Sequence, residues 1–198
     1  RLRHDPLLVQ ALIPRLQVAG IHALGIEFAC SEDQALADAV VTASEYDEAA
    51  VRRLLFHNMT VWGYQEYEDI YRAAWNVNRS RAPHSPPFRV LGLMYRARWD
   101  LLRPEDPDSA RAKVWTQGDP DAHMATVILD AIRAGTQRLL VYSGSHHAFT
   151  KYLQPIYDSD TKHLVRLSDS RMGTLVARAL PGRTFTIFLH SPWTDPED

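Results

Sequence analysis

Two adjacent histidines, His146 and His147, follow an apolar run at residues 138–143 in the stretch RLLVYSGSHHAFTKY. The run is typical of a β-strand, and the Ser-Gly-Ser turn after it favours the end of the strand and the start of a helix. Imidazole titrates near neutral pH, so a histidine here is suited to general base catalysis or metal ligation. Neighbouring side chains point in different directions, and the residues alone do not decide which histidine faces a site.

Glu27 is a second candidate, because it interrupts the apolar run IHALGIEFAC at residues 21–30. Strand alternation places it on the same face as two small residues, Gly25 and Ala29. A buried carboxylate without a partner costs several kcal/mol, so Glu27 needs one. Two interpretations stay open: a functional acid near a strand end, or a structural acid bonded to backbone amides or to an arginine.

Two other apolar runs also end in polar residues, namely FRVLGLMY and TFTIFLHS. The first ends at Tyr95, a candidate ligand-binding residue, and is followed by Arg96, which could clamp a carboxylate or phosphate-like group, pair with Glu27 or be solvated. The second carries His190 near its end, which is a candidate ligand-binding residue or an exposed loop residue. The Ser-Gly-Ser turn before the two histidines would present backbone amides that favour an oxyanion.

Helical periodicity separates these runs, with the clearest amphipathic pattern at residues 64–79. Strands that alternate with helices of ten or more residues predict an α/β fold with a mainly parallel central sheet flanked by helices. In such sheets ligands bind in a pocket outside the carboxyl ends of the strands. The predicted strands are residues 21–30, 88–95, 138–143 and 184–191, and the predicted helices begin near Asp5, Ser31, Ser44, Tyr64, Asp119 and residue 171.

Composition is that of a globular protein, with 198 residues of which 45% are hydrophobic and 23% charged. This composition predicts a single domain over residues 1–198. Because the chain opens directly before a helix signal, we expect a first strand to precede Arg1.

A net charge of −2 favours neither a nucleic-acid partner nor a membrane surface, and no apolar run has the length of a membrane span. Cys30 is the only cysteine, which excludes an internal disulfide and a zinc–thiolate cluster. No signal peptide is visible, so a cytoplasmic location is favoured.

Most of the chain resembles one superfamily, which includes the ChaN-like haem-binding proteins, the erythromycin esterases and the Tiki/TraB proteins. The resemblance rests on the order of five short stretches, GIHALGIEFAC, VWGYQEYEDIYRAAWNVN leading to FRVLGL, DAHMATVILDAI, LLVYSGSHHAF and RMGTLVARAL with FTIFLH. It implies an α/β fold whose pocket at the strand ends contains a Glu and a His.

The resemblance also singles out individual residues. Glu27 matches the strand acid, and His147 matches the histidine that precedes a small residue, which leaves His146 as a candidate ligand-binding residue. Asp121 matches the acid three residues before a Met-Ala pair, although Pro120 stands where an arginine is often found. The family usually has a glycine-histidine element on an N-terminal strand, and His4 is the candidate remnant of that element here.

These residues suggest a hydrolase in which His147 acts as general base on water, Glu27 orients it, and Arg96 or the turn amides stabilise the oxyanion. In a variant, Glu27, His147 and His4 hold a divalent metal. The alternative is a haem- or iron-binding protein, with a histidine as axial ligand and aromatic residues lining the pocket. A catalytically silent interaction domain is a third hypothesis. The first two imply a small-molecule ligand, and all of them leave a homo-oligomer open.

Overall fold

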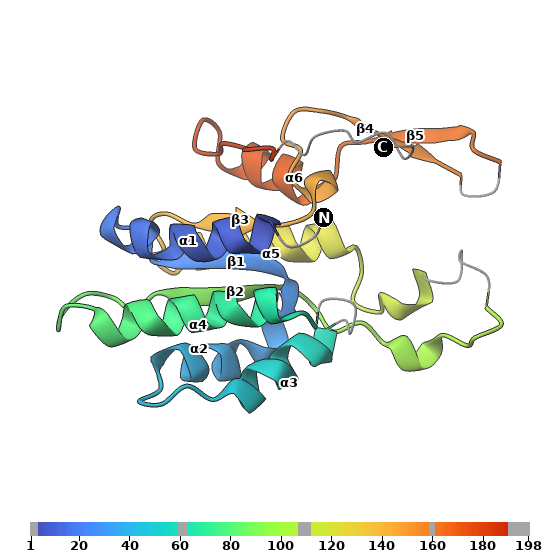
Figure 1. The fold of residues 1–198 in the computed structure, drawn as a ribbon. Helices are drawn as coiled ribbons and strands as arrows, with labels where there is room; N and C mark the ends of the chain where they lie inside the picture. Colours follow the sequence, from blue (N-terminus) through green and yellow to red (C-terminus); the bar gives the residue numbers. More distant parts are fainter. Residues whose placement is uncertain (1–3, 59–62, 107–111, 159–160, 190–198) are drawn as a thin grey trace, which may run out of the picture.

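Helices and strands are mixed along the chain in the computed structural model, which describes residues 4–58, 63–106, 112–158 and 161–189 (Figure 1). The expected strand before Arg1 lies outside these residues. The elements in chain order are α1 (His4–Val18), β1 (Ala23–Cys30), η1 (Ser31–Asp33), α2 (Gln34–Thr42), α3 (Glu48–Asn58), α4 (Gln65–Ser80), β2 (Arg89–Met94), η3 (Trp99–Leu101), α5 (Pro120–Arg133), β3 (Leu140–Tyr142), η5 (Ser145–His147), β4 (Gln154–Tyr157), β5 (Leu164–Ser168) and α6 (Met172–Ala179).

Strands β1, β2 and β3 form a parallel sheet in the order β2-β1-β3. The central strand is in register with both neighbours, so that Leu24 is opposite Val90 on one side and Leu140 on the other. The carboxyl ends of parallel strands meet at one edge of a sheet, which brings the end of β1 close to the turn that follows β3. A separate two-stranded antiparallel sheet joins β4 and β5.

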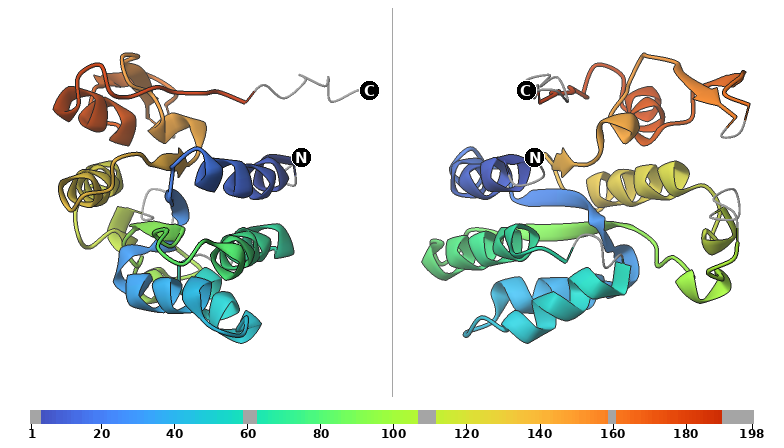
Figure 2. Two further views of the ribbon diagram at one scale, coloured as in Figure 1. Left: turned by 90° about the vertical axis from the view of Figure 1, so that its left-hand side faces the viewer. Right: turned by 45° about the vertical axis from the view of Figure 1, so that its right-hand side comes forward.

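Two hydrophobic clusters cover the two faces of the sheet. Helices α1, α2, α3 and α4 pack on one face, where Ile13, Leu24 and Tyr71 are buried. Helices α5 and α6 pack on the other face, where Met124, Leu93 and Met172 are buried. Figures 1 and 2 show α4 and α5 on opposite sides of β1 and β2. The α5 side is the one that carries the candidate site.

Helix α5 begins where the sequence predicts. The Asp119 side chain accepts a hydrogen bond from the Ala122 amide at 3.0 Å, and Pro120 occupies the first turn, where its missing N–H costs nothing. Helix α3 begins at Glu48, a few residues after the predicted start near Ser44, and the Asp47 side chain accepts the hydrogen bond of the Ala50 amide at 2.9 Å. Among the described residues, no helix has the length and apolarity that a membrane crossing requires.

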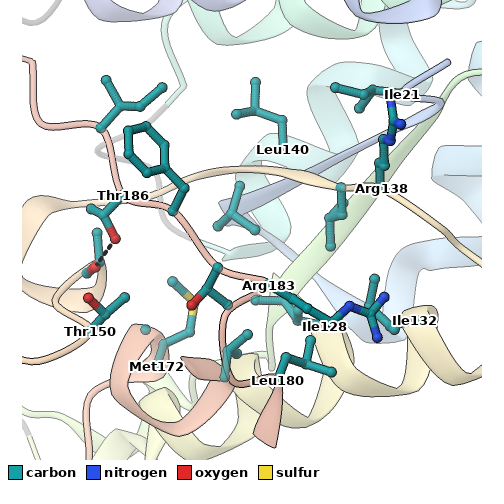
Figure 3. Close-up of a pocket in the computed structure, with 18 of the residues that line it drawn as sticks. Ile21, Ile128, Ile132, Arg138, Leu140, Thr150, Met172, Leu180, Arg183 and Thr186 are labelled. Atoms are coloured by element: carbon teal, nitrogen blue, oxygen red, sulfur yellow. Dashed lines mark hydrogen bonds between the residues drawn. The ribbon is translucent and has the colours of Figure 1, made fainter. Parts of the chain in front are cut away.

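The predicted strand at residues 184–191 is wrong over its described part, because residues 184–189 are irregular and pair with no strand that the structure describes. Its alternating pattern indicates extended backbone, but a strand also needs a neighbouring edge within hydrogen-bonding distance. A cavity of about 420 Å³, lined by β3 and by residues 183–187, separates the two segments (Figure 3). The apolar side chains of the segment therefore stay exposed, with Phe185 at 88% and Ile187 at 67%.

The predicted helix after the two histidines is also shorter than expected. It is the single turn η5, after which the chain extends into β4 and β5, two strands that the sequence analysis missed. The stretch FTKYLQPIY after Ala148 is rich in aromatic and β-branched residues, which favour extended backbone over helix.

Candidate functional site

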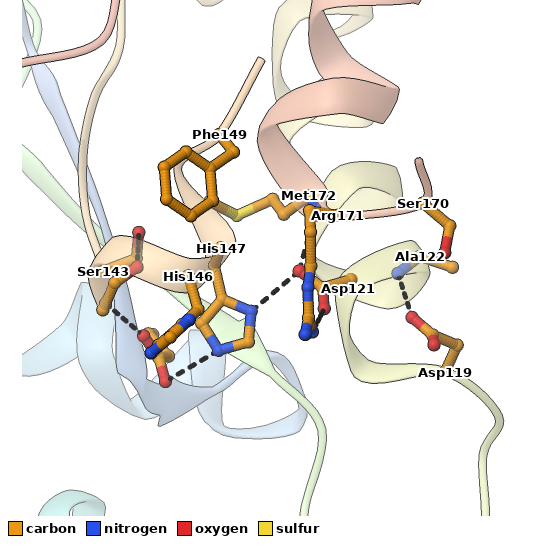
Figure 4. A network of polar contacts seen from close by, with 12 residues as sticks. Asp119, Asp121, Ala122, Ser143, His146, His147, Phe149, Ser170, Arg171 and Met172 are labelled. Atoms are coloured by element: carbon orange, nitrogen blue, oxygen red, sulfur yellow. Dashed lines mark hydrogen bonds and ion pairs between the residues drawn. The ribbon is translucent and has the colours of Figure 1, made fainter. Parts of the chain in front are cut away.

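His147 lies between two carboxylates (Figure 4). Its Nδ1 atom is 2.7 Å from Asp121 Oδ1, and its Nε2 atom is 3.5 Å from Glu27 Oε1. The side chain is 22% exposed, so it is mostly buried but keeps some contact with solvent. The three residues come from η5, from the first turn of α5 and from the end of β1.

Asp121 is the most buried member of the site, with 5% of its side chain exposed. Its Oδ1 atom also accepts a hydrogen bond from the Met172 amide at 2.8 Å, at the start of α6, and its Oδ2 atom accepts one from Arg171 Nη1 at 2.8 Å. A guanidinium and a helix N-terminus both stabilise negative charge. Burial alone would raise the pKa of Asp121, but the hydrogen bonds from His147, Met172 and Arg171 lower it below the usual value.

The ionised Asp121 fixes the tautomer of His147. A carboxylate can only accept hydrogen bonds, so Nδ1 of His147 must carry the proton that it donates. The second nitrogen, Nε2, then faces Glu27 and is the atom that can gain or lose a proton. This is the arrangement in which a buried acid orients an imidazole for general base catalysis.

Glu27 is held by the turn that precedes the histidines. Its Oε2 atom accepts a hydrogen bond from the Gly144 amide at 2.6 Å, which leaves Oε1 directed at His147. Backbone amides were one of the partners that the sequence left open for this acid. The Gly144 amide therefore binds a carboxylate of the protein itself, rather than being free for a substrate oxyanion.

The electrostatics of the site favour a positive charge on His147. Burial disfavours the imidazolium, but the hydrogen bond to Asp121 and the negative charge of Glu27 outweigh it. Together they raise the pKa of His147 above the ordinary value of about 6.5. A proton taken up by Nε2 is therefore stabilised by carboxylates on both edges of the ring.

His146 points elsewhere. It is exposed, and its Nδ1 atom lies 2.5 Å from Gln154 Nε2. Of the two adjacent histidines, His147 is the one between the acids, and His146 was predicted only as a ligand-binding residue. Gln154 in turn accepts a hydrogen bond from Arg171 Nε at 2.7 Å, so His146 joins the outer part of the same network.

Two predicted site residues lie in other environments. Arg96 follows β2, where its Nη2 atom is 2.8 Å from Asp33 Oδ1 and its amide donates to Glu32 Oε1 at 3.1 Å. Its charge is thus neutralised by η1 and is not directed at His147, which corrects its predicted role at the oxyanion. Tyr95 is fully buried, with its hydroxyl donating to the Gly118 carbonyl at 2.5 Å, so it belongs to the core and not to a ligand site.

Two further predictions fall outside what the structure describes. His190 lies beyond residue 189, and the side chain of His4 is not described, although its backbone begins α1. Cys30 is free and buried, and burial raises its pKa to about 12, so it holds its proton at neutral pH and is a poor nucleophile.

The described residues do not by themselves fit a metal or a haem. Catalytic zinc takes three protein ligands, whereas Glu27 Oε1 and His147 Nε2 are two donors, and Nδ1 of the ring is bonded to Asp121. No group of three His, Cys, Asp or Glu side chains that could hold a metal ion occurs in the described ranges. A haem ligand needs an open imidazole nitrogen beside an apolar cavity, and Nε2 instead faces a carboxylate.

Arg171 and Gln154 are the site residues that the sequence analysis did not identify. Arg171 directly precedes α6 and bridges Asp121 to Gln154. Its sequence signals are its position at the start of a predicted helix and as the first residue of the stretch RMGTLVARAL, and neither indicates a site role. Gln154 lies in a strand that was not predicted.

The comparisons with known proteins give one match. No protein-family model matches the chain, and neither does any curated protein. Among solved structures, the chain is similar to the type III effector HopBA1, with a TM-score of 0.48 and 17% sequence identity. The match covers 76% of this chain and 64% of HopBA1, so the chain spans less than two thirds of that protein's length.

Proposed function

We propose that the protein is a hydrolase in which His147 activates a water molecule, as the resemblance to the ChaN-like, erythromycin esterase and Tiki superfamily implies. The observation that carries the proposal is the alignment of Asp121, His147 and Glu27, with an acid on each ring nitrogen. The second acid faces the nitrogen that a general base uses.

A water molecule at the open edge of His147 can donate one hydrogen bond to Nε2 and the other to Glu27 Oε1. Its oxygen lone pair is then directed away from both groups, toward an electrophilic acyl carbon of a bound substrate. As the oxygen attacks, one O–H bond breaks and its proton passes to Nε2. The resulting imidazolium lies between two carboxylates and can return the proton to the leaving group.

The remaining residues of the network hold His147 and Glu27 in position. Asp121 keeps the proton on Nδ1, while Arg171 and the Met172 amide keep Asp121 ionised and immobile. Gly144 keeps Glu27 in place through its amide. Because the pKa of His147 is raised, the base form dominates only above that raised pKa, so hydrolysis should increase as the pH rises above about 6.5.

The test is hydrolysis of a panel of carboxylic esters and lactones by the wild-type chain, His147→Ala and Glu27→Gln, with and without a chelator. We expect activity that falls by about 10²- to 10⁴-fold in His147→Ala, the usual contribution of a general base. His163→Ala, at an exposed histidine outside the network, is the matched control and should stay near the wild-type rate. Activity that survives both His147→Ala and Glu27→Gln would contradict the proposal, and loss of activity on chelation would replace it with the metal-dependent variant.

A further inference from the structure

The cavity beside β3 has the size and lining of a ligand site. Its volume of about 420 Å³ falls in the range of roughly 300–1,000 Å³ that small-molecule pockets occupy. Most of its wall is aliphatic, with Ile128 and Ile132 from α5, Leu139 and Val141 from the β3 region, and Val176 from α6. This wall favours an apolar chain over a polar ligand.

Two positively charged side chains line one side of this cavity. Figure 3 shows Arg138 beside Ile21 and Arg183 beside Ile132, both away from Thr150 and Thr186. Arg138 donates one hydrogen bond, to the Ala19 carbonyl at 3.3 Å, and the Arg183 side chain has no partner among the described residues. No described residue of the lining is an Asp or a Glu, so the two guanidinium charges are not neutralised within the cavity.

Apolar side chains on the rim are left uncovered. Phe185 and Ile187, on the segment opposite β3, line the cavity and are 88% and 67% exposed. Large apolar side chains that gather beside a hollow are typical of a binding site rather than of ordinary surface. An apolar chain lying in the cavity would cover them.

We propose that this cavity binds an amphipathic carboxylate, a medium-chain fatty acid. Its carboxylate would pair with Arg183, whose guanidinium presents paired N–H donors that match the two oxygens, and Arg138 would add positive charge on the same side of the cavity. Its alkyl chain would lie along α5 and α6 and under Phe185. His147, Glu27 and Asp121 do not line the cavity, so the proposal goes beyond the hydrolase function and does not depend on it.

Titration calorimetry of the full chain with decanoate, below its micellar concentration, tests the proposal. We expect saturable binding that weakens roughly fourfold for each methylene removed, in octanoate and then hexanoate. Arg183→Gln should weaken binding by about tenfold or more, as for a lost hydrogen bond between charged groups, and Arg138→Gln should weaken it less, because only a nearby charge is lost. Arg133→Gln is the matched control, because Arg133 lies on α5 outside the lining and pairs with Asp130.

Three results would overturn the proposal: no saturable binding of decanoate, equal binding of decylammonium, or arginine variants that bind as tightly as wild type. Arg138→Lys and Arg183→Lys keep the charge and should recover part of the affinity, which separates a lost contact from a misfolded chain. His147→Ala should leave decanoate binding unchanged, so the outcome is distinguishable from failure of the proposed hydrolase function.

Discussion

Asp121 and His147, 26 positions apart in the chain, are joined by a hydrogen bond of 2.7 Å between a buried carboxylate and Nδ1 of the ring. The bond fixes which nitrogen of His147 is available for chemistry. It also explains how a half-buried imidazole can have a raised pKa, since the hydrogen bond and the nearby Glu27 outweigh the desolvation of the charged ring.

Replacing Asp121 with Asn should keep the shape of the site and remove its charge. The neutral amide no longer favours an imidazolium and can turn its N–H₂ group toward Nδ1, which places the wrong tautomer at Glu27. We expect the hydrolytic rate to fall by about 10²- to 10⁴-fold. Asp130→Asn, an exposed position on the same helix, is the control, and an unchanged rate in Asp121→Asn would show that the acid does not orient His147.

Stability should depend on pH through His147. Because its pKa is raised in the folded state, its contribution is complete below the unfolded-state value of about 6.5 and is lost as the pH rises through the folded-state value. Urea unfolding of wild type and His147→Gln should therefore give a difference in unfolding free energy that shrinks across this window. Asp121 has a lowered pKa, so its contribution is lost at the acid end instead. A difference in unfolding free energy that stays constant or grows as the pH rises above 6.5 would contradict this expectation.

Gly173, at the start of α6, should not tolerate a side chain. A Cβ atom there would lie 2.6 Å from the Phe149 carbonyl oxygen and 2.8 Å from Ala148 backbone atoms, just after His147. The backbone must move to relieve these contacts, and we expect the free energy of unfolding to fall by about 1–3 kcal/mol, as for other overpacked sites. Chemical denaturation of Gly173→Ala measures this loss of stability, and Arg178→Ala, at an exposed position on the same helix, is the control. A wild-type midpoint would mean that α6 and the His147 turn are not packed as described.

The sequence predicts those parts of the fold whose signals are local. The amphipathic pattern of residues 64–79 matches α4, and the Asp-Pro signal marks the start of α5. The runs around Glu27 and before His147 are the strands β1 and β3. These elements need only propensity, capping and periodicity, all of which are carried within a few residues of the chain.

The predictions that are wrong or missing concern contacts between segments far apart in the chain. Residues 184–189 have the alternation of a strand but lie across a cavity from β3, and nothing in their own pattern reveals the missing neighbour. In the site, Arg171 binds Asp121 across 50 positions and Gln154 across 17. Arg96 is directed to Asp33 by the same kind of long-range contact. Contacts of this kind are set by how the elements pack, which periodicity does not encode.

Titration of the His147 ring by NMR, in wild type, Glu27→Gln and Asp121→Asn, tests the central claim most directly. The account predicts a pKa above about 6.5 in wild type, a lower pKa in each variant, and a proton on Nδ1 in the neutral form. A wild-type His147 that titrates at or below the ordinary value, and does not respond to loss of either carboxylate, would contradict the account.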